Sequence, residues 1–235
     1  MKRAAYYPIS EQAMLVEFGQ EISEELRNKI RLFTDLLDQQ NFPWLVEYIP
    51  AFTNVTIIFD LLYFKENPGQ SHERIQEEIE NILSSTEQET LKSPDSEPVK
   101  IPVCYDEEFG MDLDEVANYN GLSKEEVITL HTEGIYPVYM IGFSPGFPYL
   151  GGMTGKIAAP RKEKPRPKIP AGSVGIAGTQ TGVYPLETPG GWQIIGRTPL
   201  SLFDPAKEPP ALLKAGDSVQ FYRISKEEYN RLKES

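Results

Sequence analysis

The sequence predicts an α+β protein, with a small antiparallel α+β domain followed by a β-rich domain. Residues 1–84 read as strand, strand, helix, strand, strand and helix, an order typical of a small antiparallel sheet with both helices on one side. Residues 142–197 instead place glycine or proline every few positions between short apolar runs. Because proline removes a backbone donor and clashes with a preceding helical turn, this stretch favours short strands joined by tight turns.

Four strands are expected in the first domain. Tyr6–Ile9 and Ala13–Phe18 flank a short polar turn, and Trp44–Ile49 and Asn54–Phe59 are separated at a proline. Each run is rich in β-branched or aromatic residues and is bounded by turn formers, which is the usual signature of a strand.

Two helices complete this domain. Ser23 is a suitable N-cap for a helix over residues 24–39, and a second helix is expected over residues 71–83. Apolar residues at helical spacing predict their buried stripes, which are Leu26, Ile30, Phe33 and Leu37 in the first and Ile75, Ile79 and Ile82 in the second.

A linker is predicted at residues 85–98, which are polar, aperiodic and contain two prolines. The first domain is therefore expected at residues 1–84 and the second at residues 99–235. The regular elements expected outside the glycine-rich stretch of the second domain are a strand at Val99–Tyr105, a helix at Asp112–Tyr119, a helix from the capping box of Ser123 and Glu126 to Gly134, and strands at Tyr136–Ile141 and Ser218–Ile224.

The totals exclude several classes of protein. The chain has 235 residues, and its 23 basic against 35 acidic side chains give a net charge of −12, which argues against nucleic-acid binding. One cysteine, Cys104, excludes an internal disulfide and fits a reducing compartment. With two histidines no structural zinc site is expected. No apolar run reaches the ~20 residues of a membrane span and no signal peptide is evident, so we expect a cytoplasmic protein without a membrane partner.

The glycine-rich stretch has the composition of a small-molecule pocket. Aromatic residues can supply apolar walls and polar residues can supply specific contacts, the mixture usual for such pockets. The aromatic candidates are Phe143, Phe147, Tyr149, Tyr184 and Trp192, and the polar ones are Ser144, Thr179, Gln180, Thr181, Glu187, Thr188 and Arg197.

Two familiar motifs fail on mechanism. Residues 142–146 fit the G-x-S-x-G pattern of a hydrolase nucleophile elbow, but Pro145 lacks the N–H that the oxyanion hole needs. Residues 151–156 resemble a phosphate loop, but Leu150 stands in place of its first glycine and Ile157 in place of the Ser or Thr that binds magnesium.

Three charged features have two interpretations each. Residues 161–168 carry five basic side chains and one acid, and form either a solvated loop or a clamp for a phosphate or carboxylate. Arg197 follows an apolar run and either binds such an anion or braces Glu187. His131 lies near the end of a helix and is either a cap that interacts with the helix dipole or a catalytic base.

Arg197 and His131 are the candidate catalytic residues, and no residue is expected to bind a metal. The candidates for substrate or nucleotide binding are Phe143, Ser144, Gly146, Phe147, Tyr149, Arg161, Arg166, Gln180, Thr181, Glu187, Thr188, Trp192, Arg197 and Thr198.

Three long motifs give the chain a family resemblance. GFSPGFPYLGG, PRPKIPAGSVGIAGTQTGVYPLETPGGWQIIGRTP and LFDP resemble the signature of the 5-oxoprolinase B-subunit family, which includes the Kip-type inhibitor of a sporulation sensor histidine kinase. The resemblance covers about residues 131–220 and implies a cyclophilin-like β-barrel for the second domain.

The resemblance also implies two functions. The first is that of the B subunit of an enzyme that, with its A and C subunits, uses ATP, with magnesium as its counterion, to open 5-oxoproline to L-glutamate. In that case the chain alone is expected to be inactive, since it has no complete nucleotide loop or nucleophile. The second is docking on the dimerisation helices of a sensor histidine kinase, which would block autophosphorylation. One protein can have both functions.

Overall fold

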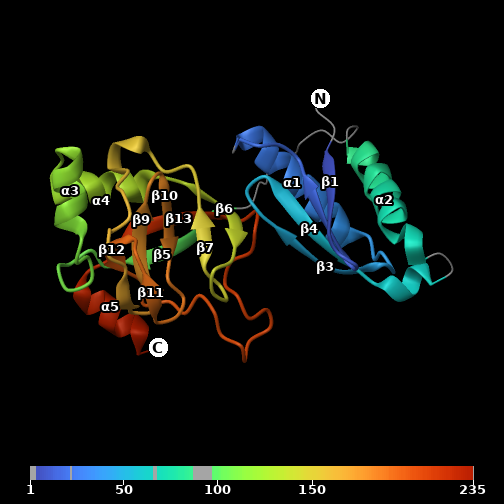
Figure 1. The fold of residues 1–235 in the computed structure, drawn as a ribbon. Helices are drawn as coiled ribbons and strands as arrows, with labels where there is room; N and C mark the ends of the chain where they lie inside the picture. The colour runs from blue at the N-terminus through green and yellow to red at the C-terminus, as the bar shows by residue number, and fades with distance from the viewer. Residues whose placement is uncertain (1–3, 22, 66–67, 87–96, 235) are drawn as a thin grey trace. The chain divides into compact units, whose positions relative to one another are not determined.

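The computed structural model describes residues 4–21, 23–65, 68–86 and 97–234. It contains two compact units, residues 1–95 and 96–235, which are coloured blue to blue-green and green to red in Figure 1. Most of the predicted linker, residues 87–96 of 85–98, lies outside the described residues.

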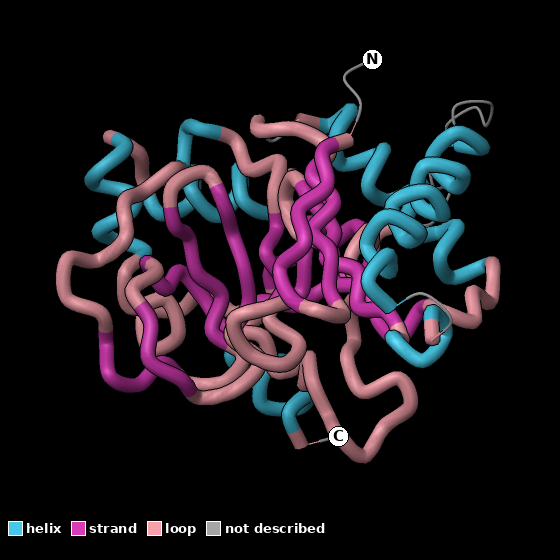
Figure 2. The backbone as a smooth tube through the Cα atoms, turned by 45° about the vertical axis from the view of Figure 1, so that its right-hand side comes forward, coloured by secondary structure: helices cyan, strands magenta, loops and turns pink. Residues whose placement is uncertain are grey.

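The first unit contains a four-stranded antiparallel sheet and two long helices. The strand order is β1 (Ala5–Ser10), β2 (Ala13–Glu17), β4 (Asn54–Phe59) and β3 (Leu45–Pro50). Helices α1 (Glu24–Gln39) and α2 (Ser71–Thr86) contact each other and share one core with one face of the sheet (Figure 2). Two short 3₁₀ helices, η1 (Leu61–Phe64) and η2 (Pro68–Gln70), lie between β4 and α2.

Local sequence signals account for these helices. The hydroxyl of Ser23 accepts a hydrogen bond from the Leu26 N–H at 3.1 Å and so caps α1 as predicted. The predicted apolar stripes of both helices are confirmed, because every one of their residues is buried: Leu26, Ile30, Phe33, Leu37, Ile75, Ile79 and Ile82.

The second unit is built on a seven-stranded, nearly closed sheet (Figure 1). Its order is β12 (Gln193–Arg197), β9 (Ser173–Ala177), β10 (Gln180–Val183), β7 (Pro148–Leu150), β6 (Tyr136–Ile141), β13 (Ser218–Arg223) and β5 (Val99–Val103). Cys104 follows β5 directly and exchanges two backbone hydrogen bonds of 2.9 Å with Arg197 at the end of β12. This pair joins the two edge strands, and the predicted α+β class with a C-terminal barrel is confirmed.

The remaining elements surround the barrel. Helix α4 (Lys124–Glu133) opens with the predicted capping box of Ser123 and Glu126. The others are α3 (Leu113–Asn120), η3 (Gly155–Ile157) and a separate two-stranded sheet of β8 (Arg166–Ile169) and β11 (Thr188–Gly190).

Helix α5 (Lys226–Lys233) was not predicted, although its N-terminus carries a clear signal. Ser225 caps it by accepting from the Glu228 N–H at 3.2 Å. Among the described residues, no helix is both long and apolar enough to cross a membrane.

Candidate functional site

The aromatic residues predicted to wall a pocket lie together in the second unit. We call Phe143, Phe147, Tyr149, Tyr184 and Trp192 the aromatic cluster. The ring of Phe147 is its centre, with centroids 5.2 Å from Tyr184, 5.5 Å from Trp192 and 4.9 Å from Tyr149, all edge to face. Burial raises the pKa of Tyr184 to about 12, so its phenol stays neutral at physiological pH.

Phe143 lies at the exposed edge of the cluster in a strained conformation. Its φ is +69°, and it is the one non-glycine residue with positive φ among those described. The turn around it is closed by hydrogen bonds between Gly142 N–H and Phe147 O at 3.1 Å and between Phe147 N–H and Ser144 O at 3.0 Å. Its ring, 62% exposed, contacts Phe147 and Tyr184 edge to face. Strain of this kind costs about 1–3 kcal/mol and is concentrated at functional sites.

The next residues of this turn are also shaped by their surroundings. The Oγ of Ser144 is buried and has no hydrogen-bond partner among the described residues. A buried hydroxyl without a partner is uncommon and calls for an explanation, such as a ligand. Gly146 has a φ of +77°, and a Cβ there would lie 2.7 Å from the Cβ of Phe203, so glycine is required.

Residues 161–168, the basic loop, are held by ion pairs that were not predicted. Asp112, at the start of α3, is 2% exposed. Its carboxylate accepts hydrogen bonds from both terminal nitrogens of Arg166, at 2.6 and 2.8 Å, and from the Nζ of Lys162 at 3.0 Å. Lys168 pairs with Glu187 at 3.0 Å. Burial alone would raise the pKa of Asp112, but hydrogen bonds from Arg166, the Ile194 N–H and Lys162 outweigh it and lower the pKa.

Arg161 is the member of the basic loop that reaches the aromatic cluster. It is exposed, and its guanidinium carbon lies 5.9 Å from the centroid of the Trp192 ring, within cation–π range. Arg166 is committed to Asp112 in a two-pronged pair. Of the two arginines in the basic loop, the structure therefore leaves Arg161 at the cluster.

Arg197 and Thr198 are separated from this cluster. Trp192 directly precedes β12 and Arg197 ends it, so the two residues lie on the order of 15 Å apart at ~3.3 Å per residue. The Nε of Arg197 donates to the carbonyl of Ala171 at 2.7 Å. Thr198 is buried, and its N–H donates to Gly172 O at 2.9 Å. The predicted residues thus occupy two places rather than one.

The predicted alternative that Arg197 braces Glu187 does not fit the structure. The carboxylate of Glu187 pairs with Lys168, and the Nε of Arg197 is used by the turn at Ala171. The anion-binding role of Arg197 stays a prediction.

His131 and Thr181 lie inside the core, where neither can contact a ligand in solvent. Both have an exposed fraction of 0%. Thr181 Oγ1 donates to Gly175 O at 3.0 Å, so it accepts from His131 Nε2, which lies 3.0 Å away. Because the neutral ring then carries its proton on Nε2, His131 Nδ1 accepts from the Tyr105 hydroxyl at 2.7 Å. Burial lowers the pKa of His131 to about 3. A neutral, enclosed imidazole fits neither the catalytic base nor the charged helix cap that the sequence suggested.

The last polar candidates lie in less enclosed places. Gln180 begins β10 and is partly exposed, and Thr188 begins β11 with its hydroxyl 3.4 Å from Pro189 O. Within the described ranges there is no group of three or more His, Cys, Asp or Glu side chains that could hold a metal ion.

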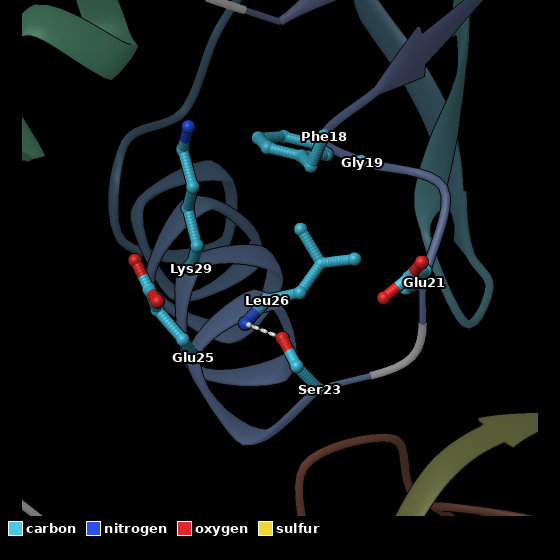
Figure 3. A pocket seen from close by; sticks show the side chains of 7 residues that line it. All are labelled: Phe18, Gly19, Glu21, Ser23, Glu25, Leu26 and Lys29. Carbon is cyan, nitrogen blue, oxygen red and sulfur yellow. Dashed lines mark hydrogen bonds between the residues drawn. The ribbon is translucent and has the colours of Figure 1, made fainter. Parts of the chain in front are cut away.

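A hollow of about 210 Å³ lies in the first unit at the start of α1 (Figure 3). The Nζ of Lys29 sits 5.6 Å from the centroid of the Phe18 ring beside it. The Ser23 hydroxyl at its rim already serves as the helix cap, so this hollow is a weaker candidate than the aromatic cluster. The lining residues are Phe18, Gly19, Glu21, Ser23, Glu25, Leu26 and Lys29.

Known proteins resemble this chain over both units. Residues 4–213 match the family described as the carboxyltransferase domain, subdomain C and D. The chain is 50% identical to the B subunit of 5-oxoprolinase from Bacillus subtilis (strain 168) over 96% of this chain and 95% of that protein. It is 44% identical to the B subunit of 5-oxoprolinase from Escherichia coli O157:H7 over 94% of this chain and 96% of that protein. The crystal structure of a conserved uncharacterized protein from Pyrococcus horikoshii is similar, with a TM-score of 0.56 and 43% identity over 96% of this chain and 100% of that one.

Proposed function

This chain belongs to the 5-oxoprolinase B-subunit family, and from that premise we propose that it is the B component of an enzyme that opens 5-oxoproline to L-glutamate with ATP, together with the A and C subunits. The observation that carries the proposal is the 50% identity to a B subunit of 5-oxoprolinase over nearly the whole of both chains.

The aromatic cluster and Arg161 suit this substrate. 5-Oxoproline is a small ring with one carboxylate, and a guanidinium can bind a carboxylate through two parallel hydrogen bonds. Arg161 brings that guanidinium to the edge of an aromatic wall, where the ring of the substrate would pack against Phe143. The hydroxyl of Ser144, which has no partner among the residues that the structure describes, offers a further hydrogen bond.

The chemistry needs ATP because a lactam is a stable amide. Transfer of the γ-phosphoryl group to the lactam oxygen would create a phosphate leaving group at the ring carbon. Water would add to that carbon, and departure of the ring nitrogen as an amine would break the C–N bond and leave an acyl phosphate. A second water molecule would hydrolyse this acyl phosphate to the carboxylate of L-glutamate and inorganic phosphate. Such a transfer depends on positioning and on positive charge around the phosphates.

This chain supplies little of that charge by itself. Lys162, Arg166 and Lys168 are ion-paired to carboxylates of the same chain. The sequence also lacks a phosphate loop, so we propose that the other subunits hold most of the triphosphate and its magnesium. A cytoplasmic location also stays a prediction.

The experiment is 5-oxoproline-dependent ATP hydrolysis, measured as phosphate and L-glutamate release. The chain alone should give no turnover, and the chain with the A and C subunits should give robust turnover. Full activity of the single chain would contradict the proposed division of labour. A reconstituted mixture that is inactive with 5-oxoproline but active with another cyclic amide would contradict the substrate.

Inhibition of a sensor histidine kinase is the second candidate function. The observation that favours it is Phe143, an aromatic residue with a strained backbone that is 62% exposed and available to a protein partner. This function predicts that the purified chain lowers autophosphorylation of such a kinase, and that the Phe143→Ala variant lowers autophosphorylation less than the wild-type chain does. Equal inhibition by the wild-type chain and the variant would show that Phe143 does not belong to the kinase-binding surface.

A further inference from the structure

Arg161 is held between two anchored neighbours. The carbonyl of Pro160 accepts a hydrogen bond from the Nε2 of Gln193 at 3.1 Å, and the N–H of Lys162 donates to Gly191 O at 2.7 Å. Gln193 and Gly191 flank Trp192 in sequence. The backbone on each side of Arg161 is therefore tied to the segment that carries the ring beneath its guanidinium.

Asp112 holds the side chains of the same loop. Its carboxylate accepts from the guanidinium of Arg166 through two hydrogen bonds and from the Nζ of Lys162 through one. Lys162 is held a second time by Glu115 at 2.6 Å. Glu115 also accepts from Gln193 Nε2 at 3.1 Å, which connects this network to the anchor of Pro160.

The position of Asp112 restricts what it can do. With 2% exposure and all four contacts made within the chain, its carboxylate cannot reach a ligand in solvent. Removing its charge would leave Arg166 without a carboxylate partner and Lys162 with Glu115 alone. The two neighbouring cations would then repel each other with less opposing charge between them, so the loop should move away from α3.

We propose that Asp112 is a positioning residue that acts through Lys162 and Arg166 to hold Arg161 over Trp192. This inference deepens the proposed function, on which its relevance to substrate rests. The expected consequence is pre-organisation, because an exposed arginine on a loose loop would have to be ordered when substrate binds.

The test uses ¹⁹F NMR of the full chain labelled with 5-fluorotryptophan. The protein has two tryptophans, so Trp192 reports on Arg161 while Trp44, buried in the first unit, reports an unchanged fold. Arg161→Gln should shift the Trp192 resonance. Asp112→Asn should shift it to nearly the same place, and the double variant should add nothing further, since both act on one contact.

Two further variants keep the test decisive. If Asp112→Asn unfolds the second unit, Arg166→Gln, which removes one partner of Asp112, should shift the Trp192 resonance part of the way. Lys168→Gln removes a cation of the same loop that pairs with Glu187, and it should leave the resonance in place. A Trp192 resonance that stays at the wild-type position in folded Asp112→Asn, or shifts that add in the double variant, would overturn the proposal.

A kinetic measurement separates this inference from the proposed function. In the complex with the A and C subunits, Asp112→Asn and Arg161→Gln should each raise the KM for 5-oxoproline by about ten-fold, and the double variant should raise it no more. If the NMR shifts agree but neither variant changes the KM, the positioning of Arg161 holds and its assignment to the substrate carboxylate is wrong.

Discussion

Asp112 and Ile194 are joined by two hydrogen bonds. The Asp112 N–H donates to the Ile194 carbonyl at 2.8 Å, and the Ile194 N–H donates to Asp112 Oδ2 at 2.7 Å. Ile194 lies in β12, the edge strand that meets the other edge of the barrel at the pair of Cys104 and Arg197. The start of α3 thus satisfies backbone groups that an edge strand would otherwise leave unpaired. One buried carboxylate supports both the barrel edge and the basic loop.

Asp112→Asn should therefore lower the free energy of unfolding of the second unit by about 1.5–3 kcal/mol. The loss should be smaller than for a fully buried ion pair because Lys162 and Arg166 are partly exposed. Urea unfolding followed by the ¹⁹F resonance of 5-fluorotryptophan at Trp192 would measure it for the second unit, since Trp44 reports on the first. Glu107→Gln, which removes an exposed partner of Lys124, is the control and should change the value by less than about 0.5 kcal/mol. Equal effects of the two substitutions would contradict the central role of Asp112.

His131 should remain neutral in the folded protein from pH 8 down to about pH 4, because burial lowers its pKa to about 3. In the unfolded chain an ordinary histidine takes up a proton near pH 6.5. The contribution of His131 to stability is thus fully present above pH 6.5 and is lost as the pH falls from there toward 3, by up to about 1.4 kcal/mol per pH unit. NMR titration of the two histidine rings, assigned with His72→Gln, checks this. A His131 midpoint near 6.5 would contradict its enclosure.

Phe143→Gly should leave stability nearly unchanged while weakening the site. Glycine adopts a φ of +69° without strain, which offsets the lost ring contacts, whereas Phe143→Ala keeps the strain and should be the less stable of the two. Both variants should raise the KM for 5-oxoproline in the assembled complex by several-fold. Tyr119→Ala removes a ring that is 66% exposed on α3 and serves as the control for both measurements. A normal KM in both Phe143 variants would exclude this ring from the substrate site.

Arg197→Lys should leave the protein folded and able to bind the C subunit, and should lower the activity of the complex by about ten-fold or more, since lysine cannot reproduce a two-pronged contact with an anion. The lost bond to Ala171 should lower the melting temperature by a few degrees. Glu187→Gln should change that temperature little, because Glu187 pairs with the exposed Lys168 instead. Normal activity per folded complex would remove Arg197 from the site.

Signals carried by neighbouring residues were read correctly from the sequence. The cap of Ser23, the capping box of Ser123 and the apolar stripes of α1 and α2 each depend on spacings of three or four residues, and all are present in the structure. The cap of Ser225 has the same spacing, although helix α5 was not among the predicted elements.

Contacts between distant residues could not be read in this way. The ion pair of Asp112 with Arg166 joins residues 54 positions apart, and nothing in either neighbourhood selects the other as partner. The five aromatic residues do lie together, but Arg197 does not join them. It is only five residues after Trp192, yet the extended strand β12 between them carries it away from the cluster. Nothing in the sequence around His131 or Thr181 indicates that they are buried. They are enclosed only because helix α4 packs on the barrel and brings the two side chains together.

The most direct test of the account is the KM for 5-oxoproline of the complex with the A and C subunits carrying Arg161→Gln, measured by 5-oxoproline-dependent ATP hydrolysis. Arg161 lies at the aromatic cluster and is proposed to bind the carboxylate of the substrate. The KM should therefore be at least about ten-fold higher, the effect of one lost charge-assisted contact, with the complex still assembled. A KM and kcat equal to those of the wild-type complex would contradict it.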